Sequence, residues 1–429
     1  NAMAIKYPGL WYQQSGDRRF SDAVFEGIKK YDLNHGQAGG RFSGDEHLSG
    51  KSPDRGTELC AVVEYMFSLE ELYAIFGDNR LADRLELLAY NALPGTTTPD
   101  MWAHQYDQQS NQVVVNGEKR AWSTNGNYSN IYGLMPNFAC CLANMHQGWP
   151  KFVSSLWMAT NDKGLIAVAY GPSSVKAKVG NGRMVEITEE TYYPFDGKIK
   201  FSIKSEEAVR FPLYLRIPDW ADTAVISYKD KIIYEKGGST AKIFARWDPD
   251  DVITMELPMD VRAEKRYNNS LSLLRGPLYY SLRIGKEFKS VKINYDNFGY
   301  MGSVDWEINP LTPWNYGLMV DRNNLKRGIT VITAEPGRYP FADRGDMIWS
   351  ADSARYLPWD QDAPVILKTR GMLIPGWTLK DNSADIPPLS PVKPEGDNAV
   401  IELVPYGSAR LRITEFPVID LTQVVSVLK

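Results

Sequence analysis

The sequence predicts a multidomain protein in which a helical part precedes an all-β part. The chain has 429 residues, which is too many for one ordinary hydrophobic core. Before residue 158, apolar residues recur at helical spacing in several segments. From about Gly164 onward, short runs of β-branched and aromatic residues alternate with Gly, Pro and Asp turns. This second pattern is typical of one or two β-sandwiches or jelly rolls.

The composition excludes two classes of partner and leaves a third open. A net charge of -4 gives no basic surface for nucleic acid or an anionic membrane, and no apolar run is long enough to span a bilayer. We therefore expect neither partner. The 12 Trp and 24 Tyr outnumber the 15 Phe, and their flat faces with polar tips suit sugar rings. Large β-sandwiches are also rich in aromatic residues, so this signal has two interpretations.

The N-terminal third is expected to be helical around one long connection. We predict helices over residues 20–33, 57–76 and 79–92, with Gly77 ending the second and Asp78 capping the third. Residues 96–135 show no regular pattern, and a connection of that length is usually functional. It carries several polar and aromatic side chains that could line a pocket, among them His104 and Tyr106.

The cysteines predict a metal site. There are three, and Cys140 and Cys141 are adjacent, so they rarely satisfy disulfide geometry with each other. With Glu58, two residues before Cys60, they are a suitable ligand set for tetrahedral zinc. Helices that begin at Thr57 and near Pro136 would point two N-termini, which favour thiolates, at one cation. The alternative is that each cysteine merely packs in the core.

Glu46 is a candidate general acid. It lies in the glycine-flanked loop Gly44-Asp45-Glu46-His47, shortly before Glu58. Glycines allow tight turns and a close approach of a ligand to the backbone. A carboxyl group held by a rigid frame can protonate a glycosidic oxygen. A solvated acidic loop would explain the same residues.

Several segments resemble a known family. Gly56-Thr57-Glu58-Leu59-Cys60-Ala61 and the Cys140-Cys141 pair resemble the Glu-x-Cys and paired-cysteine motifs of glycoside hydrolase families 127 and 146, which are bacterial β-L-arabinofuranosidases. Residues 211–221, 274–280 and 404–407 resemble segments of the family's β domains. The resemblance runs from about residue 36 to the C-terminal region.

The resemblance implies roles for individual residues. It implies a zinc ion held by Glu58, Cys60, Cys140 and Cys141. Cys140 would be the nucleophile and Glu46 the acid/base of a retaining hydrolase. The loop between Glu46 and Glu58 is shorter than the family pattern. The resemblance further implies contacts with the sugar or the thiol for Glu86 and Tyr106, and we add His104 as a pocket residue.

The resemblance also implies an architecture. Family members carry an (α/α)6 barrel before their sandwiches, and too few helices fit before Gly164 for a whole one. We expect residues 1–158 to be the C-terminal part of an (α/α)6 catalytic barrel that lacks its N-terminal helices. Residues 159–285 would form a β-sandwich, and 286–429 a second sandwich or jelly roll whose final strands could return to the first. An incomplete barrel could impair activity, and its open apolar faces could be buried in a homo-oligomer.

The expected function is hydrolysis of β-L-arabinofuranosides or a related plant-glycan sugar, with a plant-derived oligosaccharide as partner. One alternative is a non-catalytic carbohydrate-binding or scaffold protein with a structural zinc site. A second alternative is a metal-free helical domain with core cysteines. The sequence leaves open the exact sugar and the compartment, for which the bacterial periplasm or cytoplasm are the candidates.

Overall fold

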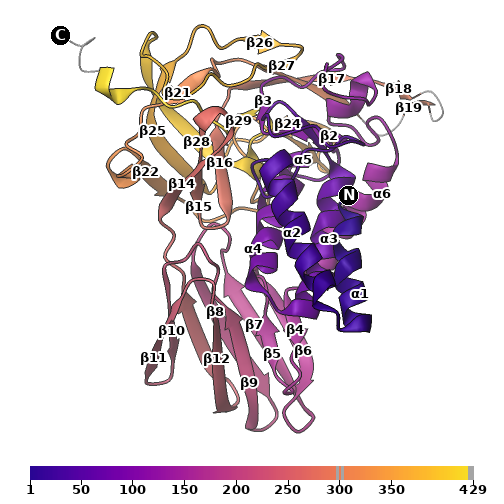
Figure 1. Cartoon of the computed structure of the whole chain (residues 1–429), viewed down its shortest axis with the longest axis vertical. Coiled ribbons are helices and arrows are strands. Elements are labelled where there is room, and N and C mark those ends of the chain that lie inside the picture. The colour runs from indigo at the N-terminus through magenta and orange to yellow at the C-terminus, as the bar shows by residue number, and fades with distance from the viewer. Residues whose placement is uncertain (296–298, 301–303, 424–429) are drawn as a thin grey trace.

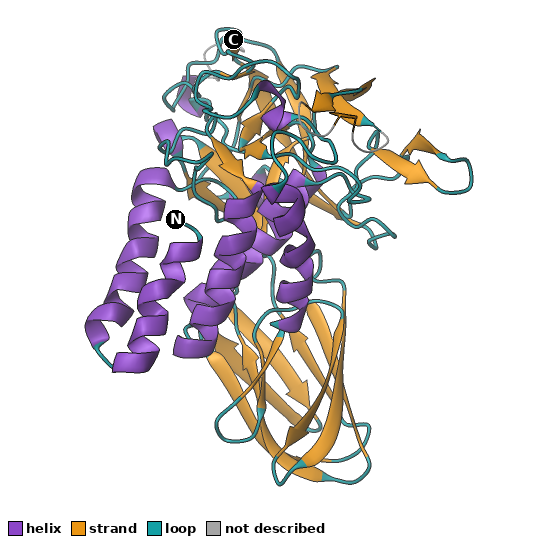
Figure 2. Cartoon of the chain, turned by 90° about the vertical axis from the view of Figure 1, so that its right-hand side faces the viewer, coloured by secondary structure: helices purple, strands orange, loops and turns teal. Residues whose placement is uncertain are grey.

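The computed structural model describes residues 1–295, 299–300 and 304–423. Helices stand beside a β-sandwich at one end of the molecule and beside a second β region at the other end (Figure 1). The view turned by 90° shows the helices as one group covering one side of the β regions (Figure 2). The chain is thus a mixed α and β protein with a helical part and several sheets. Within the described residues, no helix is long and apolar enough to cross a membrane.

The helical part is built around α3. Asp17 caps α2 and Asp78 caps α4, each by accepting a hydrogen bond from a backbone N–H two residues later. Gly77 adopts the left-handed conformation, φ 63°, that ends α3. After α4 the helix continues as a π-helix over Leu88–Ala92 and then through Pro94, which is tolerated at the first turn of α5. The helices are α1 Tyr7–Ser15, α2 Arg18–His35, α3 Leu59–Phe76, α4 Asn79–Leu87, α5 Leu93–Thr96 and α6 Cys140–Ser154.

The middle of the chain forms a sandwich of two sheets. One sheet has the strand order β11-β10-β13-β8-β7-β6 and the other β12-β9-β5-β4. Alternate residues of β7, Val185, Ile187 and Glu189, are buried between the sheets, as the period of two requires. The strands are β4 Trp157–Ala159, β5 Leu165–Ala167, β6 Ser173–Val179, β7 Arg183–Thr191, β8 Lys198–Ser205, β9 Val209–Arg216, β10 Thr223–Tyr228, β11 Lys231–Lys236, β12 Thr240–Trp247 and β13 Val252–Glu256.

The next strands belong to a different sheet, of order β14-β15-β16-β28-β25-β21, with β22 also paired to β25. Residues 261–282, expected within the middle sandwich, therefore share a sheet with strands from the last third of the chain, through the pairing of β16 with β28. These strands are β14 Val261–Lys265, β15 Leu271–Arg275, β16 Leu278–Leu282, β21 Tyr316–Leu318, β22 Thr330–Thr333, β25 Val365–Leu373 and β28 Asn398–Pro405. Small hairpins decorate this region: β17 Lys286–Val291 with β20 Asp305–Pro310, β18 Asn294–Tyr295 with β19 Gly299–Tyr300, β23 Met347–Ser350 with β24 Arg355–Pro358, and β26 Leu379–Lys380 with β27 Ser383–Ala384.

The C-terminal region is joined to the helical part through buried polar contacts. β29 (Arg412–Ile413) pairs with β3 (Asn111–Gln112), in the long connection between α5 and α6. The buried guanidinium of Arg41 donates to Thr57 Oγ1 at 2.6 Å and to Tyr406 Oη at 3.0 Å. A buried cation requires such partners, because it has lost its water. Arg41 thereby links Thr57, the residue before Glu58, to Tyr406 in the C-terminal region.

Candidate metal centre and active site

The first pair of candidate ligands lies where a strand becomes a helix. β1 (Gly56–Glu58) pairs with β2 (Asp107–Gln109), and α3 starts at Leu59. Glu58 is therefore the extended N-cap residue, φ −64° and ψ 139°, while Cys60 is in the first helical turn. This change of backbone direction lets side chains two residues apart point at the same space, which a regular helix forbids.

The second pair begins α6. The helix starts at Cys140, four residues later than Pro136, where we predicted it. Asn137 adopts a left-handed φ of 61°, and its side-chain oxygen accepts from the backbone N–H of Gly126 at 2.9 Å. Cys140 and Cys141 are consequently the first two helical residues, where free N–H groups and the helix dipole stabilise thiolates.

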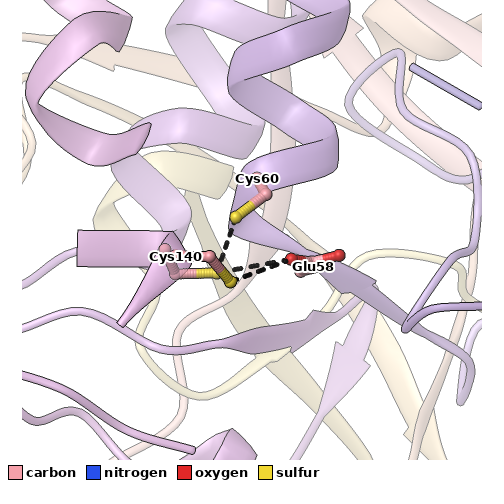
Figure 3. Close-up of side chains that lie close together, drawn as sticks. Glu58, Cys60 and Cys140 are labelled. Atoms are coloured by element: carbon pink, nitrogen blue, oxygen red, sulfur yellow. Dashed lines mark hydrogen bonds between the residues drawn. The ribbon is translucent and has the colours of Figure 1, made fainter. Parts of the chain in front are cut away.

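The four side chains converge. Cys60 Sγ lies 3.4 Å from Cys141 Sγ, and Glu58 Oε1 lies 3.6 Å from Cys140 Sγ and 3.8 Å from Cys141 Sγ. Figure 3 shows Glu58, Cys60 and Cys140 pointing toward one another, and one ligand atom from each of the four residues lies within 4.8 Å of the others. Tetrahedral zinc with bonds of about 2.3 Å to sulfur would separate its ligands by roughly 3.7 Å. The donor set therefore fits a metal ion.

Burial makes negative charge costly in this cluster. It raises the pKa of Glu58 to about 7 and the pKa of Cys141 well above its usual range. The thiol of Cys141 donates to Cys140, and this hydrogen bond contributes most to lowering the pKa of Cys140 to about 5. Cys140, the half-buried member of the adjacent pair, therefore ionises before Cys141. A cation would allow the remaining thiols to ionise as well.

Tyr106 connects this cluster to Glu46. The Tyr106 hydroxyl donates to Glu46 Oε1 at 2.5 Å and lies 3.7 Å from Cys140 Sγ. Glu46 is exposed and has a left-handed φ of 83°, which is uncommon for a residue with a side chain. Asp45 fixes this turn, because its buried carboxylate accepts from the Thr124 N–H at 2.9 Å and contacts His47 Nδ1 at 2.9 Å. The carboxyl group of Asp45 is thereby buried and anchors the turn. The carboxyl group of Glu46 is exposed and faces the Tyr106 hydroxyl, which lies beside Cys140.

Glu86, an expected sugar contact, lies elsewhere. Its buried carboxylate forms an ion pair with Arg216 at 2.6 Å and accepts hydrogen bonds from the Tyr193 hydroxyl at 2.5 Å and the Tyr170 N–H at 3.1 Å. These partners all come from the middle sandwich, so Glu86 joins α4 to that domain. The expectation is corrected: a fully buried carboxylate occupied by these partners is not placed to meet a sugar.

His104, expected to line the pocket, is also enclosed by the protein. It is 1% exposed, its Nδ1 is hydrogen-bonded to the Gln105 carbonyl at 3.0 Å, and its backbone pairs with Gly133. Burial lowers its pKa to about 4, so the ring is neutral at physiological pH. A neutral, enclosed imidazole supports the long connection and does not line an open pocket.

Two asparagines lie near the site. Asn125 belongs to the long connection whose polar side chains were expected to line a pocket, whereas Asn144 was not singled out from the sequence. Asn144 Nδ2 lies 3.1 Å from Cys60 Sγ, and Asn125 links Asp107 to Asn137 by hydrogen bonds of 3.1 and 3.0 Å. Asn144 follows Cys140 by four residues, a spacing that places both on one helix face, so this neighbour was detectable. Asn125 lies in an irregular segment, where spacing gives no comparable signal.

Comparisons with known proteins match two consecutive regions of the chain, the first of which contains the site. A model of the β-L-arabinofuranosidase GH127 catalytic domain matches residues 12–154, which contain all four candidate ligands. A model of the β-L-arabinofuranosidase GH127 middle domain matches residues 164–259, the region of the first sandwich. No curated protein sequence matches the chain.

Solved structures share the fold. Ara127N-Se, a GH127 β-L-arabinofuranosidase from Geobacillus stearothermophilus T6, superposes with a TM-score of 0.65 at 18% identity, over 96% of this chain and 58% of its own. A glycoside hydrolase gives 0.63 at 14% identity, over 97% and 65%. The GH127 β-arabinofuranosidase BT3674 gives 0.61 at 14% identity, over 99% and 60%. The chain thus spans less than two thirds of the length of each of these structures.

The resemblance seen in the sequence is therefore confirmed. The two domain models together match more than half of the chain, in the same order as its helical part and first sandwich. The ligand cluster lies within the residues matched to the catalytic domain. The chain belongs to the GH127-like family of glycoside hydrolases.

Proposed function

We propose that this chain is a retaining glycoside hydrolase that cleaves β-L-arabinofuranosides or a related plant-glycan sugar, with a plant-derived oligosaccharide as its substrate. One observation carries the proposal: Cys140 Sγ belongs to the ligand cluster, and a single tyrosine hydroxyl separates it from the exposed carboxylate of Glu46. This proximity supports the roles of Cys140 as nucleophile and Glu46 as proton donor at one site. The catalytic-domain match and the activity named for Ara127N-Se support the same reaction class.

We propose zinc as the metal. Three thiolates and one carboxylate are a borderline-soft donor set, which suits zinc better than calcium or magnesium. Glu58, Cys60, Cys140 and Cys141 would hold it. When bound, the ion would supply positive charge that keeps the thiols ionised and makes Cys140 a better leaving group.

The remaining chemistry belongs to the side chains. The Cys140 sulfur attacks the anomeric carbon while Glu46 donates a proton to the departing glycosidic oxygen, so that a C–S bond forms as the C–O bond breaks. Glu46 then removes a proton from water, which attacks the same carbon and releases the thiolate. Two displacements retain the anomeric configuration. Tyr106 orients Glu46 through its 2.5 Å hydrogen bond.

The architecture is proposed on the same basis. We propose that α1–α6 form part of an (α/α)6 barrel, and that the sandwich of β4–β13 is the domain that follows it. In support, the ligand cluster lies at the N-terminal ends of α3 and α6, two helices that pack against each other. We also propose that two copies of the chain associate and cover exposed apolar residues of the helical part, such as Tyr7 and Trp11 of α1.

Two substitutions test the reaction. Cys140→Ser should abolish hydrolysis of an aryl β-L-arabinofuranoside by the zinc-loaded chain. Glu46→Gln should lower kcat by about 10²–10⁴-fold on substrates with poor leaving groups and much less on activated aryl substrates, which need no proton. A wild-type chain without turnover at any zinc concentration would contradict the proposal and favour a carbohydrate-binding protein with a structural metal.

A further inference from the structure

α6 carries a polar side chain that reaches the ligand cluster without belonging to it. Asn144 is half-buried and follows Cys140 by one helical turn. Its Nδ2 lies 3.1 Å from Cys60 Sγ and 3.2 Å from the Cys140 carbonyl oxygen. Its Oδ1 accepts from Gln147 Nε2 at 3.1 Å. Both N–H bonds and the carbonyl oxygen of this amide therefore have a partner.

These three partners fix the orientation of the amide. A flipped Asn144 would turn its oxygen toward the Cys140 carbonyl and the Cys60 sulfur, and both of those atoms are acceptors. It would also turn its nitrogen toward the nitrogen of Gln147. The observed orientation is the one in which every contact joins a donor to an acceptor. An N–H group thus points at Cys60, whereas Cys140 faces the Tyr106 hydroxyl.

We propose that Asn144 is a positioning residue that adjusts the metal centre through Cys60. A hydrogen bond to a thiolate stabilises its negative charge and reduces the electron density that the sulfur donates. A metal bound to this weaker donor draws more charge from Cys140. The leaving ability of the nucleophilic sulfur then depends on a residue that touches neither substrate nor metal. The inference rests on the proposed function, since it requires the cluster to bind a metal.

Cobalt binding tests this role separately from turnover. The full chain, kept reduced, is titrated with Co²⁺ in competition with a chelator, and the sulfur-to-cobalt charge-transfer absorption is recorded. Asn144→Leu keeps the size of the side chain and removes the N–H. It should bind cobalt about 10- to 100-fold more weakly, because Cys60 loses the hydrogen bond that stabilises its negative charge and orients it toward the metal. Its charge-transfer band should move to longer wavelength, because the sulfur electrons are no longer stabilised.

Two further variants make the result decisive. Gln147→Leu keeps the Asn144 N–H but frees the amide to rotate, and should give a smaller change in the same direction. His146→Gln alters an exposed side chain on the same helix and should match the wild type.

Wild-type affinity and spectrum in Asn144→Leu would overturn the inference. If that variant does not fold by circular dichroism, an unchanged Gln147→Leu spectrum would overturn it instead. A wild-type chain that binds no cobalt would refute the metal site itself, and the inference with it.

Discussion

At the scale of single residues, neighbouring acidic side chains acquire different tasks from their surroundings. Asp45 is buried and holds the loop, whereas Glu46, turned out by a left-handed backbone, faces the Tyr106 hydroxyl. Burial raises the pKa of Asp45 because it disfavours the charged carboxylate. The hydrogen bond from the Thr124 N–H and the contact with His47 offset this effect and hold the side chain in the interior. The carboxyl group of Asp45 thus holds the loop, whereas the carboxyl group of Glu46 is a candidate general acid.

Tyr106→Phe tests the link between the two candidate catalytic groups. Removal of the hydroxyl deletes a hydrogen bond to a charged group, worth about 1.5–3 kcal/mol, so kcat should fall by roughly 10- to 100-fold. Steady-state kinetics on an aryl β-L-arabinofuranoside measure the effect. Tyr128→Phe, in the same connection but with an exposed ring, is the matched control. Equal rates for the two variants would remove Tyr106 from the proposed site.

The candidate ligands could be predicted from the sequence because cysteine, which supplies three of the four, is scarce in this chain. All three cysteines and Glu58 meet as expected from the two motifs. Glu86 was misplaced because its partner Arg216 lies 130 residues downstream, and no local pattern discloses such a pairing. His104 was misplaced because burial of a loop residue depends on the fold around it. Asn144 was missed although its spacing from Cys140 was informative.

At the scale of elements, the turn from β1 into α3 controls the site. The helix was predicted to begin at Thr57, but it begins at Leu59, and the preceding three residues pair with β2. Caps and periodicity could place the helix to within two residues, whereas the short strand depends on a partner from the long connection. That strand gives Glu58 the extended conformation that brings it beside Cys60.

Gly56→Ala tests how closely this strand is fitted. A Cβ atom at Gly56 would lie 2.1 Å from the Trp122 ring, so backbone or ring must move. Overpacking of this kind costs about 1–3 kcal/mol, and displacement of Glu58 should also weaken cobalt binding. Thermal melting and the chelator competition measure the two effects. Gly328→Ala, which meets no atom within 4 Å, should leave both unchanged.

Glu86→Gln separates anchoring from catalysis. Arg216 and Glu86 are both fully buried, and Arg216 also pairs with Asp83. Loss of the Glu86 charge therefore removes one ion-pair partner of Arg216 and should destabilise the fold by about 1–3 kcal/mol. Cobalt affinity of the folded variant should be unchanged. A variant with normal melting temperature but impaired substrate binding would restore the role that the resemblance implied.

At the scale of the whole molecule, the sequence predicted the order of helical and β parts but not how the last strands are shared. β14–β16 follow the first sandwich directly along the chain, yet β16 pairs with β28 more than a hundred residues later and so joins them to another sheet. Strand periodicity records which residues are buried and does not identify the partner strand. The pairing of β29 with β3 is equally non-local and ties the last described strand to the long connection that carries Tyr106.

Stability should depend on pH through the middle sandwich. Burial raises the pKa of Glu189 to about 8, above its ordinary value of 4.5, so the folded chain keeps a proton that the unfolded chain has lost. The contribution of Glu189 to stability should therefore decline as pH rises from about 4.5 to about 8. Glu189→Gln keeps a side-chain oxygen that can accept from the Gly171 N–H but cannot titrate, so it should flatten that part of the curve, as measured by melting temperature at several pH values. A variant with the wild-type slope would contradict this assignment.

The distance along the chain between the two ligand pairs has a further consequence. Cys60 and Cys141 are 81 residues apart, yet their sulfur atoms lie 3.4 Å from each other. A metal bound by both pairs would close a loop of that size and, by analogy with a disulfide, would remove about 4–5 kcal/mol of chain entropy from the unfolded state. The segment inside the loop includes α4, α5 and the long connection that carries Tyr106. The metal would then act as a cross-link as well as a Lewis acid, and its supply during folding would decide whether the active site is assembled at all.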